Sequence, residues 1–138
     1  MKLVARLLLT LGLLCAALTP LLAADGAGLF INLISDDAHR AQMALSFGGN
    51  QLERGHPLTV FLNDRGVNLA AKANTASFGE QQQQLAALLE KGATLIVCPL
   101  CMKHYGVDAA DLIPGAVVGN PDLTGAALFA EDTRSLTW

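Results

Sequence analysis

The sequence predicts an α/β domain with a mostly parallel sheet of about five strands and helices on both faces. Short apolar runs alternate along the chain with segments whose apolar residues recur every three or four positions, which is helical spacing. Strands and helices in alternation are typical of parallel sheets, in which right-handed crossovers place helices on both faces. The run at 28–34 is apolar at nearly every position, as expected for a central parallel strand.

The elements of the first half follow from caps and breakers. A helix is predicted over 38–54, because Gly55 can end it. Three polar residues are candidates for its N-cap: Ser35, Asp36 and Asp37. A second strand, its exit loop and one or two helical turns follow at residues 58–62, 63–66 and 67–73.

A further helix is predicted from Ser77-Phe-Gly-Glu80, which matches the capping box of a serine followed three residues later by glutamate. Leucines give this helix an apolar stripe, and Gly92 ends it. We expect the four glutamines from Gln81 to Gln84 to form its solvated face.

The last third of the chain contains a buried strand at 94–97, followed by Cys98-Pro-Leu-Cys101. Pro99 suits the first position of a helix, and Gly106 suits its exit. A helical turn capped by an aspartate, a strand, a segment ambiguous between helix and strand, and an edge strand follow at residues 108–111, 116–119, 123–130 and 135–138.

The N-terminus has the composition of a secretory signal peptide over residues 1–24. Two basic residues precede an almost unbroken apolar run over 7–22, and small residues allow cleavage after Ala23 or Ala24. A retained anchor is the alternative, but glycine and proline interrupt a run that is short for a bilayer span of about 20 residues. We therefore expect a secreted, periplasmic protein whose domain, residues 25–138, has no membrane contact after cleavage.

The charge balance argues against two classes of partner. The whole chain has a formal net charge of −3, and removal of Lys2 and Arg6 with the signal leaves seven basic against 12 acidic residues. Scattered charges in this balance give no support to a nucleic-acid-binding or anionic-membrane surface. The remaining residues have the length of one domain. A small, largely apolar domain with Met43 and Phe47 on one helix favours self-association, so we expect a homo-oligomer.

Two thiols at the start of a predicted helix are the main chemical feature. Cys15 leaves with the signal, so only Cys98 and Cys101 remain. Backbone N–H groups at a helix start favour a thiolate, which is the form that attacks sulfur or binds a metal. A disulfide closing a loop of about four residues would stabilise the fold by only about 2 kcal/mol. Sulfur, redox or metal chemistry explains the pair better than stapling, and two small buried hydrophobic side chains are the alternative.

The predicted sheet gathers candidate residues at one edge. Ligands of parallel α/β sheets bind outside the carboxyl ends of the strands, where the strand order reverses. Four predicted loops share that edge, at residues 35–39, 63–66, 98–101 and 120–122. His39, Asp64 and His104 are candidate neighbours of the thiols, although a capping or surface role is the simpler explanation for His39 and Asp64.

Three segments together resemble the DsrE/DsrF-like family. They are the first strand with Ser35-Asp-Asp-Ala-His-Arg40, the segment Gly55 to Gly66, and Val97 to Val107 followed by Asp-Leu-Ile-Pro-Gly115. The resemblance implies a flavodoxin-like, three-layer α/β subunit that forms homo- or hetero-oligomers and carries sulfane sulfur as a cysteine persulfide. The family's strand-end cysteine corresponds to Cys98. This chain departs from the better-studied cytoplasmic members in its export signal and in its second thiol, Cys101.

Sulfur transfer is the first of four functions compatible with these features. In it, Cys98 accepts sulfane sulfur from a donor protein or small sulfur compound, and Cys101 releases that sulfur by forming a disulfide. The protein would then be a sulfurtransferase-like carrier. Periplasmic thiol–disulfide redox chemistry is the second, because Cys-x-x-Cys after a strand also occurs in thioredoxin-like proteins. In those proteins, however, the motif follows the first strand rather than the third.

Copper or zinc binding is the third function. Its candidate ligands are Cys98, Cys101, Met102 and His104, and no other cofactor is expected. A closed zinc site usually draws a second pair of ligands from elsewhere, and the chain has no second Cys pair. A nonenzymatic assembly subunit is the fourth.

Overall fold

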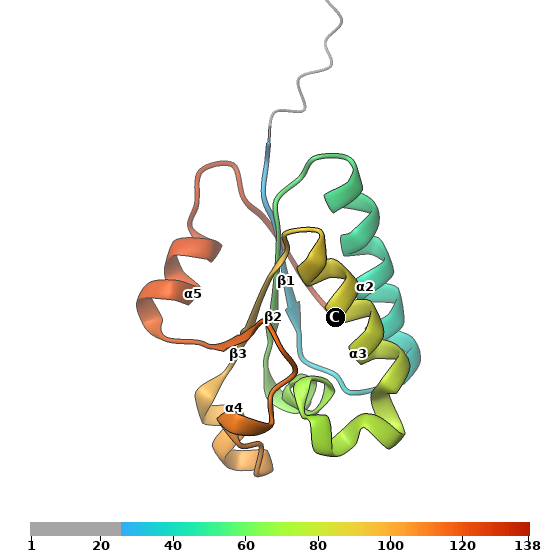
Figure 1. Cartoon of the computed structure of the whole chain (residues 1–138). Helices are drawn as coiled ribbons and strands as arrows, with labels where there is room; N and C mark the ends of the chain where they lie inside the picture. The colour runs from blue at the N-terminus through green and yellow to red at the C-terminus, as the bar shows by residue number, and fades with distance from the viewer. Residues whose placement is uncertain (1–25) are drawn as a thin grey trace, which may run out of the picture.

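Five parallel strands form the centre of the domain (Figure 1). The computed structural model describes residues 26–138, and the predicted signal peptide over residues 1–24 lies outside them. The strands are β1 (Leu29–Leu33), β2 (Leu58–Leu62), β3 (Thr94–Val97), β4 (Ala116–Val118) and β5 (Arg134–Thr137). Their order is β4-β3-β2-β1-β5, and every neighbouring pair is parallel, which confirms the predicted α/β class. Within residues 26–138, no helix is long and apolar enough to cross a membrane.

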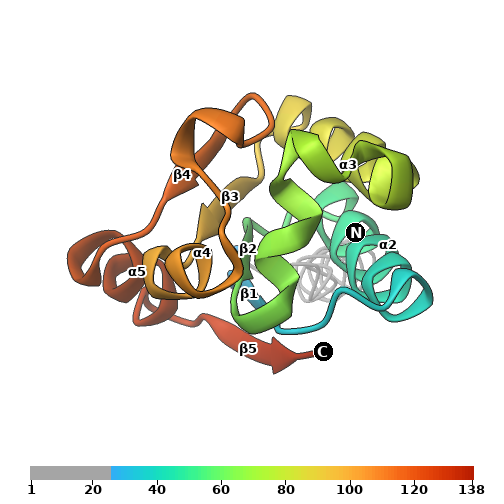
Figure 2. The same cartoon turned by 90° about the horizontal axis from the view of Figure 1, so that it is seen from below.

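Helices form a layer on each face of this sheet, and short helices lie at its carboxyl end (Figures 1 and 2). One face is covered by α2 (Ala38–Glu53) and α3 (Thr75–Glu90), and the other faces α5 (Pro121–Leu128). At the carboxyl end, α4 (Pro99–Tyr105) and the 3₁₀ helix η1 (Asp64–Ala70) lie side by side. Two further short 3₁₀ helices are η2 (Lys72–Asn74) and η3 (Ala109–Asp111).

The core lies between the sheet and the pair α2 and α3. Side chains of a strand alternate between the two faces of its sheet. Alternate residues of the three central strands are buried in this core: Ile31, Leu33, Val60, Leu62, Leu95 and Val97. The helix α5 on the opposite face has no buried residue. The two faces of the sheet are therefore packed unequally.

The start of α3 differs from the predicted capping box. The helix begins at Thr75, whose Oγ1 donates a hydrogen bond to the Lys72 carbonyl at 2.7 Å. Ser77 lies inside the helix, one residue before a kink at Phe78, where φ is −127°. The ambiguous segment 123–130 is helical over most of its length, because Asn120 accepts a hydrogen bond from the Leu123 amide at 2.8 Å and caps α5.

The glutamines of α3 correct a second expectation. Gln81 and Gln82 are only 4% and 8% exposed, so they do not form a solvated face. Gln82 Nε2 donates to the Ala71 carbonyl at 2.8 Å, and Gln81 Nε2 donates to the Ala38 carbonyl at 3.2 Å. The side chains satisfy backbone groups of neighbouring segments, which the local pattern of the sequence does not reveal.

Candidate functional site: two thiols at the carboxyl edge of the sheet

Cys98 and Cys101 lie where β3 passes into α4. Cys98 is the N-cap of α4, Pro99 occupies its first turn, and Gly106 ends it with a left-handed φ of 71°, as predicted. The Cys98 amide donates to the Leu62 carbonyl at 2.9 Å and so continues the pairing of β3 with β2. Its side chain makes no capping hydrogen bond. Both thiols are free and half-buried.

The loop after β2 holds the Cys101 thiol from two sides. Cys101 Sγ donates to Asn63 Oδ1 at 3.0 Å and accepts from the Asp64 amide at 3.2 Å. The same Asp64 amide lies 2.8 Å from Asn63 Oδ1. Asp64 has a left-handed φ of 46°, a conformation that costs a non-glycine residue about 1 kcal/mol. These contacts offset that strain.

The surroundings of Cys101 favour the protonated form of its thiol. Burial raises the pKa of the Cys101 thiol, and hydrogen bonding with Cys98 raises it further, while the Asp64 amide acts in the opposite direction. Burial and the hydrogen bond with Cys98 act on this thiol against the thiolate that a helix start is expected to favour. Cys101 is therefore suited to react second, after a partner sulfur has been brought next to it.

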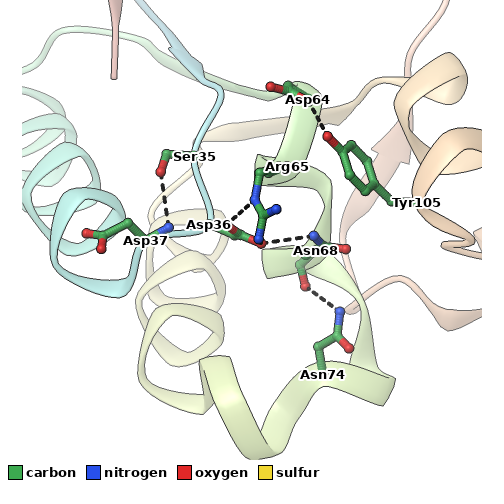
Figure 3. Close-up of polar contacts among 8 residues, drawn as sticks. All are labelled: Ser35, Asp36, Asp37, Asp64, Arg65, Asn68, Asn74 and Tyr105. Atoms are coloured by element: carbon green, nitrogen blue, oxygen red, sulfur yellow. Dashed lines mark hydrogen bonds and ion pairs between the residues drawn. The ribbon is translucent and has the colours of Figure 1, made fainter.

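Asp64 is itself fixed by a residue of α4. Tyr105 Oη donates to Asp64 Oδ1 at 2.5 Å, and Figure 3 shows the two side chains pointing toward each other from η1 and α4. This hydrogen bond raises the pKa of Tyr105, and the small burial of the phenol adds to the effect. Because Tyr105 lies four residues after Cys101, both side chains lie on one face of α4 and contact the same loop.

The remainder of η1 is held by Asp36, in the segment between β1 and α2. Arg65 donates to Asp36 from Nε at 2.8 Å and from a second nitrogen at 3.1 Å, and Asn68 Nδ2 donates to the same carboxylate at 3.1 Å (Figure 3). Burial alone would raise the pKa of Asp36, but the hydrogen bonds and the charge of Arg65 lower it overall. The Asp36 carboxylate anchors η1, and none of these hydrogen bonds connects it to Cys98 or Cys101.

The other predicted residues lie apart from the thiols. His39 is exposed at the start of α2, where it lines a hollow of about 720 Å³ with Asp37 and Arg40. His104 is exposed, and its ring packs edge-on against that of Tyr105, with the ring centroids 4.7 Å apart. Asp64 is the one candidate neighbour that contacts Cys101.

The four candidate metal ligands are not arranged around one point. Met102 is 5% exposed and packs in the core, whereas His104 is at the surface. Among residues 26–138, no group of three or more His, Cys, Asp and Glu side chains is placed to hold a metal ion.

The strand order separates the thiols from the reversal point of the sheet. The order reverses between β1 and β5, whereas β3 lies between β2 and β4. The thiols are therefore at the carboxyl edge, as predicted, but two strands away from the reversal. The hollow beside His39 lies at this reversal, since it is lined by Ile34 after β1 and Thr137 of β5.

Asn63 and Tyr105 are the site residues that sequence reasoning missed. The spacing of Tyr105 from Cys101 is a usable signal, because residues four apart share a helix face. Asn63 follows Leu62, which pairs with Val97, so Asn63 and Cys98 are the next residues on neighbouring parallel strands. An amide side chain at the end of one strand and a Cys-x-x-Cys segment at the end of the next could have suggested the contact of Asn63 with Cys101.

Comparisons with known proteins agree with this fold. A model of the DsrE/DsrF-like family matches residues 29–132. The uncharacterised protein MJ0989 of Methanocaldococcus jannaschii is 36% identical over 78 residues, which are 56% of this chain and 68% of that protein.

Two solved structures are similar to the chain at 18% sequence identity. The protein of unknown function MTH1491 from Methanobacterium thermoautotrophicum has a TM-score of 0.67, with 80% of this chain and 97% of that chain covered. The ychN protein from E. coli has a TM-score of 0.63, with coverage of 80% and 98%. Similarity at this level of identity shows a common fold.

Proposed function

We propose that the protein handles sulfane sulfur, because this chain belongs to the DsrE/DsrF-like family. In this proposal Cys98 carries sulfane sulfur as a persulfide, and Cys101 is the resolving thiol. The observation that carries the proposal is the pair of free thiols three residues apart at the carboxyl end of β3. The hydrogen bond that Cys101 donates to Asn63, which favours the protonated form of Cys101, supports the division of roles.

Loading begins with the Cys98 thiolate, which attacks the outer sulfur of a donor persulfide, R–S–SH. A bond forms between Cys98 Sγ and that sulfur, the S–S bond of the donor breaks, and the donor leaves as R–S⁻. Cys98 then holds the sulfane sulfur as Cys98–S–SH. The donor is a protein or a small sulfur compound that carries a persulfide.

Release uses the second thiol. Cys101 gives its proton to water, and its thiolate attacks Cys98 Sγ, so that a Cys98–Cys101 disulfide forms and HS⁻ leaves. The sulfane sulfur takes up two electrons, and the two thiols lose them. A dithiol reductant then restores both thiols. Transfer of the outer sulfur to an acceptor thiolate regenerates Cys98 directly and needs no reductant.

Mass spectrometry of the reduced protein after treatment with polysulfide tests this proposal. An adduct of about 32 Da per sulfur is expected on Cys98. Cys101→Ser should retain the adduct longer than the wild type, and Cys98→Ser should lack it. No adduct on Cys98, together with wild-type behaviour of Cys98→Ser, would refute the proposal. Disulfide turnover without any adduct would instead favour thiol–disulfide redox chemistry, which uses the same two residues.

Export and self-association belong to the same proposal. Cleavage after Ala23 or Ala24 would give a periplasmic protein, and the mass of the protein recovered from the periplasm tests this. Self-association is supported by exposed apolar side chains beside the edge strand β5, where Phe47 and Leu136 are each 39% exposed. Leu136→Lys should then lower the mass measured by light scattering, and a monomeric wild type would contradict this part of the proposal.

A further inference from the structure

The Cys101 thiol is part of the hydrogen-bond network that fixes the turn over residues 63–66, here called the thiol loop. Cys101 Sγ donates its hydrogen to Asn63 Oδ1 at 3.0 Å and accepts from the Asp64 amide at 3.2 Å. The Asp64 amide also donates to Asn63 Oδ1 at 2.8 Å, and the Gly66 amide donates to the Asn63 carbonyl at 2.9 Å. A change in the chemical state of the sulfur is therefore felt directly by the loop.

The other contacts of the thiol loop do not involve sulfur. Tyr105 Oη donates to Asp64 Oδ1 at 2.5 Å, and Arg65 donates to Asp36 at 2.8 Å (Figure 3). Gly66 is packed so closely against the carbonyl at the end of β1 that an added Cβ would lie 2.2 Å from its oxygen. These contacts are independent of the oxidation state of the cysteines. A change at the sulfur should therefore loosen the loop without unfolding the domain.

A disulfide between Cys98 and Cys101 would remove one hydrogen bond from this network. The two thiols interact by a hydrogen bond, which is one cause of the raised pKa of Cys101, so they lie close enough to react with each other. When the S–S bond forms, the two S–H bonds break, and two protons and two electrons pass to the oxidant. Cys101 Sγ then has no hydrogen to donate, and Asn63 Oδ1 loses this donor whatever position the sulfur takes.

We propose that Asn63 is a positioning residue that acts through Cys101 to favour the dithiol over the disulfide, and that the disulfide in turn loosens the thiol loop. The hydrogen bond from Cys101 to Asn63 exists only in the dithiol form, so it stabilises that form alone. Such coupling is reciprocal: the factor by which the closed loop disfavours the disulfide equals the factor by which the disulfide favours opening of the loop.

The coupling affects the cycle of the thiol pair. In the function proposed above, release of sulfur leaves a Cys98–Cys101 disulfide that a dithiol reductant must reduce. A network that stabilises the dithiol favours this reduction, and it returns Cys98 to the form that accepts sulfur. This consequence rests on the proposed function, whereas the coupling between the thiol pair and the loop does not.

The redox equilibrium of the thiol pair tests the role of Asn63. The protein is equilibrated with mixtures of reduced and oxidised glutathione, which supply and accept the two protons and two electrons, and the fraction of disulfide is measured by alkylation and mass spectrometry. Asn63→Leu has a similar shape but no acceptor, so it should favour the disulfide about two- to tenfold. This change lowers the reduction potential by about 9 to 30 mV. Asn63→Asp keeps an acceptor and should hold the potential at or above the wild-type value, and Asn50→Leu on the exposed surface of α2 should leave it unchanged.

Amide hydrogen exchange of the wild type tests the response of the loop. The amides of Asp64 and Gly66 report on the thiol loop, because both donate within it. They should exchange about two- to tenfold faster in the disulfide form than in the dithiol form, by the same factor as the redox equilibrium gives. The Val60 amide, in the middle of β2, should exchange equally in both forms. In Asn63→Leu, the loop amides should no longer distinguish the two forms.

Two results would overturn the proposal. One is a potential that does not change in Asn63→Leu or that changes as much in Asn50→Leu. The other is equal exchange of the Asp64 and Gly66 amides in the two wild-type forms. If Asn63→Leu does not fold, the wild-type exchange rates still decide, because they need no substitution. The proposed sulfur function fails separately: the expected coupling without any persulfide adduct on Cys98 would refute that function and leave the coupling in place.

Discussion

Replacing Asn63 should change the reactivity of Cys101 in opposite directions, depending on the new side chain. Asn63 Oδ1 accepts the thiol hydrogen of Cys101 at 3.0 Å and thereby favours the protonated form. Asn63→Ala removes this acceptor and leaves the Asp64 amide, which donates to sulfur at 3.2 Å and favours the thiolate. Asn63→Asp keeps the acceptor and adds a negative charge beside the sulfur, which disfavours the thiolate.

The magnitudes follow from the contact. A net hydrogen bond contributes about 0.5 to 1.5 kcal/mol, so Asn63→Ala should raise the thiolate fraction of Cys101 about two- to tenfold. A carboxylate 3.0 Å from a thiolate repels it by about 1.4 kcal/mol even at the dielectric constant of water. Asn63→Asp should therefore lower the thiolate fraction about tenfold.

Alkylation by iodoacetamide at neutral pH measures this, because its rate follows the thiolate fraction. The reaction is followed in a Cys98→Ser background, so that only Cys101 reacts. Asn50, exposed on α2, supplies the matched controls Asn50→Ala and Asn50→Asp, which should leave the rate within about twofold. Circular dichroism confirms folding of each variant. Rates that move in the same direction for both Asn63 variants would refute the assigned role of Asn63.

Three further predictions concern stability. Gly66→Ala should destabilise the fold by about 3 kcal/mol, because the new Cβ would press into the carbonyl at the end of β1. Gly125→Ala, in the open helix α5, should stabilise the fold by about 0.5 kcal/mol. Equal effects of the two substitutions in urea unfolding would contradict this reasoning. Gln82→Met should cost about 1 to 3 kcal/mol and exposed Gln83→Met almost nothing, and similar melting curves would show that the buried amide is not needed. The folded state raises the pKa of Cys101 above the ordinary thiol value of 9.0. The protonated thiol therefore contributes to the free energy of unfolding below pH 9.0, and this contribution is lost as the pH rises through the pKa of the folded state. Cys101→Ser should flatten the alkaline decline in stability measured by urea unfolding.

The position of the thiols could be predicted because local signals decide it. An apolar strand, a proline at the first helical position and a glycine at the exit determine where β3 ends and α4 begins and stops, and Gly106 has the left-handed φ that favours glycine. The same alternation of strands and helices predicts the parallel sheet. These features depend on residues that are close in sequence.

Features that depend on distant contacts could not be predicted in the same way. The capping box at Ser77 is a valid local pattern, but helix α3 begins earlier, at Thr75, whose hydroxyl bonds to the Lys72 carbonyl in the preceding turn. The place of β5 beside β1 depends on pairing over about 100 residues. Likewise, the contact of Asn63 with Cys101 joins residues separated by 38 positions.

The short segment from Asn63 to Asn68 contacts Cys101 at one end and Asp36 at the other, and these two contacts restrict its length. Its first two residues contact Cys101, its last binds Asp36, and Gly66 between them lies against the carbonyl at the end of β1. One inserted residue would move either Asp64 away from the thiol or Asn68 away from the carboxylate. Surface loops usually tolerate insertions and deletions, but this one leaves no room for either. Relatives that keep a thiol in the place of Cys101 are therefore expected to vary here in residue type and to keep the same length.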